Sequence, residues 1–185
     1  MALEHALLVS LSEQAASGLD LTHRFDKSIG YFWTASHQQI YRVLGRMEGD
    51  GWVHCEVVAQ QGRPDKKVYA VTEPGRLELE RWLAEPTVTD PIRSELMVKI
   101  RGASYGDRAA IIEQARESLE DHRKRLSLYE FLESKDYPNP DLLEGRELDI
   151  CLVLRGGVRL ERFWIDWLTD YIDAHTRTTT KERRP

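Results

Sequence analysis

Residues 36–47 read SHQQIYRVLGRM, and their spacing predicts a helix with one polar and one apolar side. The Ser at the start and the Gln three positions after it have the spacing of a capping box, so we expect the helix to begin there and to end near residues 49–51. At about 100° per residue, two Gln and two Arg side chains fall within roughly 100° of arc, opposite the aliphatic residues. These four polar residues are Gln38, Gln39, Arg42 and Arg46. The segment therefore predicts a helix that packs on a core and presents amides and guanidiniums to solvent.

The flanking segments predict two helices before this one, and a β-hairpin and a fourth helix after it. Apolar residues recur at helical spacing in residues 2–12 and 19–29. Two β-rich runs, 52–58 and 68–71, enclose a loop rich in polar residues with Gly and Pro, which is typical of a hairpin. Thr72 then gives a strong N-cap signal, with a Pro in the first helical turn. This element order is that of a winged helix-turn-helix, in which the third helix lies in the major groove of DNA and the hairpin lies against the backbone.

Basic residues gather in this part of the chain, although the whole chain is acidic. The chain has 26 Lys and Arg against 31 Asp and Glu, a net charge of −5, but residues 24–67 hold 7 basic and 5 acidic residues. A local positive face on an acidic chain permits a specific DNA site and disfavours general attraction to nucleic acid. We therefore expect double-stranded DNA as the partner. The predicted contact residues are His37, Gln38, Gln39, Tyr41, Arg42, Arg46, Arg63, Lys66 and Lys67.

The second half of the chain predicts long helices whose apolar residues cover much of the circumference. Asp107 is the expected N-cap of a long helix. Within this helix, residues 112–129 carry mainly apolar residues at alternating spacings of three and four, which is the period of a coiled coil. A final helix, 141–175, is apolar on more sides than one antiparallel helix can cover. We expect these helices, with the helix at 2–12, to pair two subunits as a homodimer; a hairpin within one chain is the alternative. The predicted dimer residues are Leu3, Leu7, Leu119, Leu126, Leu154, Leu160, Trp164, Trp167, Leu168 and Tyr171.

We expect a mainly α-helical fold with one small β-hairpin wing, organised in two domains. The winged helix-turn-helix occupies residues 1–85, a connector 86–106, the long-helix dimerisation domain 107–176 and a disordered tail 177–185. A composition of 41% hydrophobic and 31% charged residues suits a soluble protein. The apolar runs are far shorter than the ~20 residues that cross a bilayer, so we expect no membrane span and no signal peptide. The two cysteines, Cys55 and Cys151, form no disulfide framework, which fits the cytoplasm.

Four motifs in order along the chain resemble the PadR family of transcriptional regulators. They are SGLDL (17–21), QIYRVL (39–44), MEGDGWV (47–53), and GRP (62–64) followed by YAVTEPGR (69–76). The long terminal helices resemble the C-terminal domain of the virulence-activator (AphA-like) subgroup, so the resemblance covers nearly the whole chain. It implies a homodimer that binds an inverted-repeat operator, most often as a repressor. It also implies, from some members of the family, release of the DNA by a small aromatic effector.

Trp164, Trp167 and Tyr129 are the candidates for binding such an effector, although aromatic residues at helical spacing more often serve packing. Catalysis is not expected, because the six His have no HExxH or paired metal spacing and neither a G-x-S-x-G motif nor a phosphate-binding loop is present. We predict no metal and no cofactor. Two alternatives remain open: a winged-helix adaptor that binds proteins, and a MarR-type regulator with a different dimerisation. DNA affinity that falls steeply with salt would separate a DNA-binding protein from an adaptor.

Overall fold

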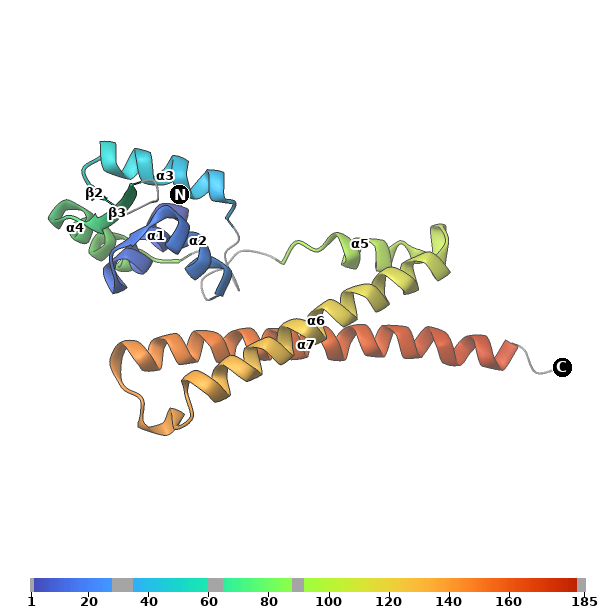
Figure 1. Ribbon diagram of the computed structural model, residues 1–185. Coiled ribbons are helices and arrows are strands. Elements are labelled where there is room, and N and C mark those ends of the chain that lie inside the picture. Colours follow the sequence, from blue (N-terminus) through green and yellow to red (C-terminus); the bar gives the residue numbers. More distant parts are fainter. Residues whose placement is uncertain (1, 28–34, 60–64, 88–91, 183–185) are drawn as a thin grey trace. The chain divides into compact units, whose positions relative to one another are not determined.

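The computed structural model places the chain in two compact units, Met1–Thr89 and Asp90–Pro185 (Figure 1). The residues that it describes are 2–27, 35–59, 65–87 and 92–182. Each unit has a hydrophobic core of its own. The predicted connector at 86–106 is divided between the two units, because its later part forms a helix that packs in the second one.

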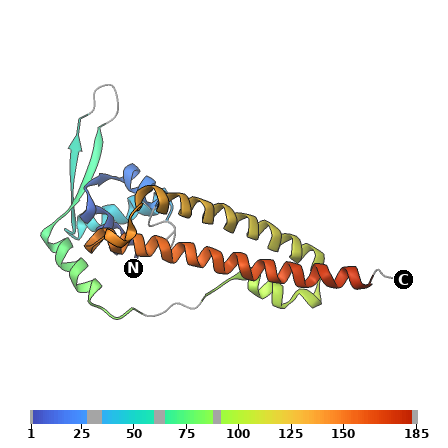
Figure 2. The same ribbon diagram turned by 90° about the horizontal axis from the view of Figure 1, so that it is seen from below.

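The first unit has the predicted order of three helices, a hairpin and a fourth helix, and one further strand that the sequence did not indicate. Its elements are α1 (Ala2–Glu13), β1 (Ala16–Ser17), α2 (Gly18–Lys27), α3 (His37–Gly49), β2 (Val53–Val58), β3 (Lys66–Val71) and α4 (Glu73–Leu83). The sheet is antiparallel, in the order β1-β3-β2, and Tyr69 pairs with Ala16 on one side and Cys55 on the other. We call the hairpin of β2 and β3 the wing; Figure 2 shows it extending beyond the helices of its unit.

Local capping interactions set the starts of α3 and α4. Ser36 is the N-cap of α3: its hydroxyl accepts from Gln39 N at 3.3 Å, and Gln39 Oε1 accepts from Ser36 N at 2.8 Å, which confirms the predicted capping box. Thr72 is the N-cap of α4, as predicted, and accepts from Gly75 N at 3.2 Å. A Cβ at Gly75 would lie 2.1 Å from the carbonyl O of Trp52. Helix α4 therefore begins in direct backbone contact with the residue that precedes the wing.

The core of the first unit is built around α1, which contacts α2, α3, α4 and β3. Contact on so many sides explains why its sequence is apolar over most of its circumference. The largest fully buried apolar side chains of the unit are Leu7, Leu8, Leu21, Phe25, Ile40, Leu44 and Met47. Each of them contributes about 1.5–3 kcal/mol by leaving water. Leu7, a predicted dimer residue, is 0% exposed and so has no surface left for a second subunit, while Leu3 packs half-buried on the same core.

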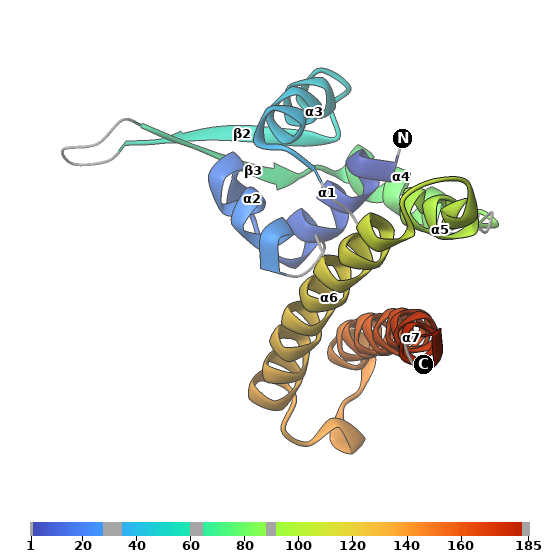
Figure 3. The same cartoon turned by 90° about the vertical axis from the view of Figure 1, so that its right-hand side faces the viewer.

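The second unit is an antiparallel pair of long helices preceded by shorter helical segments (Figures 1 and 3). Its elements are α5 (Glu95–Arg101), η2 (Ala103–Tyr105), α6 (Arg108–Asp136), η3 (Pro140–Leu142) and α7 (Gly145–Glu182). Asp107 is the N-cap of α6, as predicted, and its carboxylate accepts from Ala109 N at 2.9 Å. The first half of α6 lies beside the second half of α7, because Ala115 and Leu119 form a buried cluster with Leu168 and Ile172.

Two features of this unit bear on the expectations for the second half. Helices α6 and α7 pack on each other within one chain, and Leu119 and Leu168, two of the predicted dimer residues, are buried in that contact. Helix α7 continues to Glu182, past residue 177, where we expected the tail to begin. Within the described residues, no helix combines the length and the apolar run that a membrane crossing requires.

Candidate nucleic-acid interface

The first turns of α3 present the predicted polar face to solvent. The side chains of His37, Gln38 and Arg42 are exposed, and none of these side chains forms a hydrogen bond or ion pair with another residue that the structure describes. The opposite face of the helix is buried in the core. A Gln amide can both donate and accept at a base edge, and an Arg guanidinium can donate two parallel hydrogen bonds to guanine or to a phosphate. These side chains therefore have the free donors and acceptors that DNA recognition requires.

Gln39 and Tyr41 are exposed on the same helix but are also engaged within the protein. The carbonyl oxygen of the Gln39 side chain accepts the N–H of Ser36 in the capping box. Tyr41 is 49% exposed, and its ring lies against Gly18 at the start of α2, where a Cβ would come within 2.5 Å of Tyr41 Cε1. Both residues border the polar face, and part of each side chain is held in place by these contacts.

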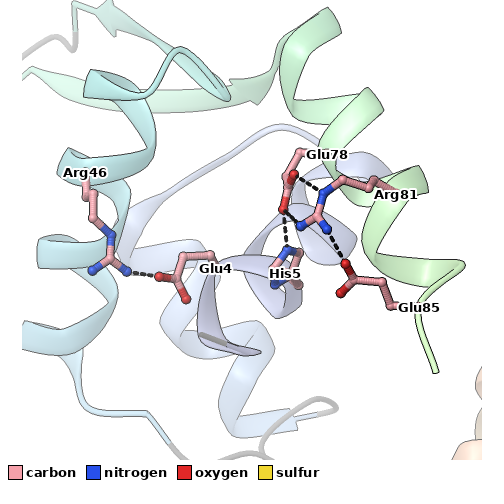
Figure 4. A network of polar contacts seen from close by, with 6 residues as sticks. All are labelled: Glu4, His5, Arg46, Glu78, Arg81 and Glu85. Carbon is pink, nitrogen blue, oxygen red and sulfur yellow. Dashed lines mark hydrogen bonds and ion pairs between the residues drawn. The ribbon is translucent and has the colours of Figure 1, made fainter. Parts of the chain in front are cut away.

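Arg46 differs from Arg42, which lies one turn before it on α3. Its guanidinium Nη2 donates to Oε1 of Glu4, in the first turn of α1 (Figure 4). The Glu4 side chain is only 10% exposed, whereas that of Arg46 is 56% exposed. A largely buried carboxylate depends on such a partner, because loss of the cation leaves an uncompensated charge in a medium of low dielectric constant.

The wing carries the second predicted group of cations. Lys66 Nζ lies 2.8 Å from Oδ2 of Asp20 on α2, and Lys67, at the next position of β3, is exposed. The hydrogen bond from Lys66, supported by two from Ser17, lowers the pKa of Asp20 from 3.8 to about 2. Arg63 was predicted in the same group and lies outside the described residues.

The start of α2 links the polar face of α3 to the wing. Gly18 contacts Tyr41 of α3, and Asp20, two residues later, pairs with Lys66 of β3. Figure 3 shows α3 beside the hairpin in the same unit. The two regions with which a winged helix-turn-helix holds DNA therefore lie together, on either side of one short segment.

A polar network that the sequence did not predict connects α1 with α4 (Figure 4). His5 Nε2 lies 2.9 Å from Oε1 of Glu78, which also accepts from Arg81 Nη2 at 2.7 Å, and Arg81 pairs further with Glu85. The contacts of Arg81, and then of His5, lower the pKa of Glu78 from 4.5 to about 2. The His5 ring stacks on Trp82, with centroids 4.5 Å apart. The available sequence signal is a Glu-His pair inside an apolar helix, since such side chains need polar partners once they are buried.

The candidate effector residues are packed within the second unit. Tyr129 is 3% exposed, and its ring lies against Gly157, where a Cβ would come within 3.3 Å of Cε2. Trp164 stacks on His122 with centroids 5.5 Å apart and meets the edge of Trp167 at 5.6 Å. Both Trp residues keep part of their surface exposed. All three aromatic side chains thus make packing contacts within the helix pair, and the two Trp side chains also keep exposed surface.

A buried acid lies beside these aromatic residues. Glu161 Oε2 lies 2.5 Å from Nδ1 of His122, and Glu161 Oε1 accepts from Arg125 Nε at 3.1 Å. Both carboxylate oxygens are thus paired, so the group is a satisfied polar contact between α6 and α7. Across the described parts of the chain, no three His, Cys, Asp or Glu side chains are grouped as metal ligands would be.

The predicted dimer residues of the second unit divide into buried and exposed ones. Leu119, Leu154 and Leu168 are buried. Leu126, Trp164, Trp167 and Tyr171 are half-buried. Leu160 is 48% exposed, and three further apolar residues of α7, outside the predicted dimer residues, are about equally exposed. We call Leu152, Val153, Leu160 and Phe163 the α7 patch. At about 100° per residue these four side chains lie within roughly 100° of arc, on the side of α7 opposite its buried residues.

Comparisons with known proteins match both units. Residues 7–81 match the model of the transcriptional regulator PadR-like family, and residues 92–176 match the virulence activator alpha C-terminal model. A probable transcriptional regulator of Mycobacterium tuberculosis is 50% identical to this chain over 184 residues, covering 94% of this chain and 97% of that protein.

Solved structures of two further proteins resemble the whole chain. The Vibrio cholerae virulence activator AphA has 32% identity and a TM-score of 0.79, over 95% of this chain and 99% of AphA. Bacillus subtilis PadR in complex with operator DNA has 25% identity and a TM-score of 0.82, over 94% of this chain and 97% of PadR. The Bacillus protein is a negative transcriptional regulator, and it has also been solved in complex with p-coumaric acid.

Proposed function

Because the chain belongs to the PadR-like family of transcriptional regulators, we propose that it binds a specific DNA operator through α3 and the wing. Its relatives are transcriptional regulators and not enzymes. The observation that carries the proposal is the first half of α3, where His37, Gln38 and Arg42 are exposed and have no polar partner among the described residues. Side chains of this kind lose few internal contacts when they turn to a base edge or a phosphate.

In the proposed complex, α3 enters the major groove with its N-terminal end. The residues that contact base edges in a helix-turn-helix come from this end of the recognition helix. Gln38 and Arg42 supply the base contacts, and His37, at the helix start, donates to a phosphate. Lys67 of the wing supplies a cation for the adjacent backbone, because it is exposed and lies beside the paired Lys66.

We further propose that the protein acts as a homodimer. The α7 patch supports this proposal, because it places four apolar side chains on one exposed side of a long helix, and association of two subunits would remove them from water. A two-fold dimer presents two recognition helices, so its operator is an inverted repeat with half-site centres about 34–36 Å apart. Pairing two half-sites also increases specificity over that of one winged helix.

We propose repression as the outcome of binding, with release by a small aromatic effector. The support is the negative regulation by Bacillus subtilis PadR and its complex with p-coumaric acid. In this chain, Trp164 and Trp167 are the proposed effector contacts because both are partly exposed, while the buried ring of Tyr129 supports the helix pair. Such a regulator works where the chromosome lies, so the proposed location is the cytoplasm.

Selection of duplexes from a random-sequence library by the purified protein, at about 0.15 M salt, tests the proposal. The expected result is an enriched inverted repeat whose affinity falls steeply with salt. Arg42→Ala should then weaken binding to the selected duplex by about 1–3 kcal/mol, with a smaller loss on random DNA, if the guanidinium contacts a base in bidentate fashion. A protein that enriches no sequence and shows no salt dependence would instead be an adaptor built on a winged-helix scaffold.

A further inference from the structure

The two exposed arginines of α3 lie one helical turn apart, but among the described residues only one of them has an ion-pair partner. Side chains at positions i and i+4 share a helix face, so the sequence alone gives Arg42 and Arg46 the same role. The structure separates them, because Arg46 pairs with Glu4 of α1 and Arg42 has no ion pair with any described residue. We propose that Arg46 is a positioning residue that fixes α3 on α1 through Glu4 and does not bind a DNA phosphate. This inference rests on the proposed function of α3 as the recognition helix.

The ion pair joins two helix ends at which each charge is already favourable. Glu4 lies in the first turn of α1, where the helix dipole stabilises an anion. Arg46 lies in the last turn of α3, where the dipole stabilises a cation. If Arg46 left Glu4 to bind a DNA phosphate, the Glu4 carboxylate, which is 10% exposed, would remain buried without its cation. The pair is therefore favoured over a new contact between Arg46 and DNA.

The position of Arg46 along α3 agrees with this role. It lies nine residues after His37, which corresponds to about 13 Å at 1.5 Å per residue. The N-terminal end of a recognition helix is the one that contacts base edges. The ion pair between Arg46 and Glu4 fixes the opposite end of α3 and so sets the direction of the helix axis. This direction determines where Gln38 and Arg42 meet the bases.

Helix α1 can hold α3 in place because α1 is itself fixed by polar and stacking contacts with α4. His5, the residue after Glu4, forms a 2.9 Å hydrogen bond with Glu78 of α4 (Figure 4). Its ring also stacks on Trp82 of the same helix. Both Glu4 and His5 are buried. Two adjacent residues of α1 thus connect this helix to α3 and to α4. The orientation of α3 therefore depends on α1, which is itself held by α4.

The test compares Arg46→Met with Arg42→Met, which removes the same charge from the same helix one turn earlier. The measurements are the melting temperature, the affinity for the selected duplex and for a random duplex of equal length, and the dependence of each affinity on salt. Arg42→Met should lower the affinity for the selected duplex and leave the melting temperature near the wild-type value. Arg46→Met should lower the melting temperature, keep the salt slope, and lower the ratio of selected to random affinity by about fivefold or more.

Two further variants separate positioning from a general effect on folding. Arg46→Lys, which keeps a cation able to reach Glu4, should restore most of the affinity ratio. Glu4→Gln should change the affinity ratio and the melting temperature in the same direction as Arg46→Met but by less, because it leaves no unpaired buried charge and its amide oxygen can still accept from Arg46. The double variant should be no worse than Arg46→Met, because both substitutions act on one interaction. Should Arg46→Met fail to fold, Glu4→Gln provides the same comparison with a neutral side chain of equal shape.

Several results would overturn the inference. A salt slope that becomes shallower by about 0.9 in Arg46→Met, with an unchanged melting temperature, would identify Arg46 as a phosphate contact. A wild-type affinity ratio in both Arg46→Met and Glu4→Gln would limit the pair to a role in stability. If the wild-type protein selects no duplex, both the proposed function and the positioning role of Arg46 are refuted. If the losses in melting temperature of Glu4→Gln and Arg46→Met add strictly in the double variant, the ion pair itself is refuted.

Discussion

Replacing Gly75 with Ala is expected to destabilise the first unit by about 1–3 kcal/mol. The added Cβ would lie 2.1 Å from the carbonyl O of Trp52, 2.9 Å from its carbonyl C and 3.0 Å from Cγ1 of Val71. Two of these atoms are backbone, so the start of α4 must move by about 1 Å to reach an ordinary separation. Overpacking of this kind costs about 1–3 kcal/mol. The same movement would strain the 3.0 Å hydrogen bond from Thr72 N to Trp52 O, which contributes about 0.5–1.5 kcal/mol to stability. The higher helix propensity of Ala offsets up to about 1 kcal/mol of the total loss.

Thermal unfolding followed by circular dichroism measures this effect. A domain of this size loses about 4–8 °C in Tm for each kcal/mol, so a loss of about 2 kcal/mol should lower the Tm by about 8–16 °C. Gly45→Ala is the matched control, because a Cβ at that position of α3 would meet nothing within 4 Å. It should raise stability by about 0.5–1 kcal/mol. A Gly75→Ala protein that melts at or above the wild-type temperature, beside a control that behaves as expected, would refute the argument from close backbone approach.

Three further predictions concern the wing, the helix pair and the α7 patch. Lys66→Met should raise the pKa of Asp20 from about 2 towards 3.8 in an NMR titration of the carboxyl carbon. In the wild type, the stability from this pair is present above about pH 4 and is lost as the pH falls through about 2, since the pKa is depressed in the folded state. Leu168→Ala removes a fully buried side chain, so denaturant unfolding should show a loss of about 2–5 kcal/mol in the second unit; a loss under about 1 kcal/mol would contradict its burial. Leu160→Glu should yield monomers in sedimentation velocity, whereas Leu77→Glu, at an exposed position of α4, should leave the dimer intact; a dimer that survives Leu160→Glu argues against the α7 patch as the dimer contact.

Helix starts were predictable from the sequence because their signals are local. Ser36, Thr72 and Asp107 are each the N-cap that the sequence indicates, and their side chains accept hydrogen bonds from N–H groups only two or three residues ahead. The polar face of α3 was predictable for a similar reason, since helix geometry alone fixes which side chains share a side. Local signals therefore defined the winged helix-turn-helix and the exposed end of its third helix.

Contacts between distant residues were not predictable in this way. Strand β1 has only two residues, too few for an alternating pattern, and it exists because β3 offers a free edge to Ala16 and Ser17. The partner of Arg46 lies 42 positions away in the sequence, so nothing near α3 shows that this guanidinium is occupied. The same holds for Lys66 and Asp20. Spacing identifies which side chains face outward, and only the fold shows which of them are still free.

The division of apolar residues between core and surface was the least predictable feature of the second unit. Helix α7 is apolar over much of its circumference, so the sequence does not show which side faces α6. The structure buries Leu154 and Leu168 and leaves Leu152, Val153 and Phe163 exposed. A helix with two apolar sides packs against two partners, and the sequence of one chain does not show which side faces which partner.

Helix α3 has one consequence for protein engineering. Ile40, Leu44 and Met47 fill the interior, while His37, Gln38 and Arg42 contribute nothing to that interior. The outer positions can therefore be randomised together without creating cavities, which makes the winged unit a scaffold for reprogramming toward chosen DNA targets. Such a library would need to leave the last turn of the helix unaltered.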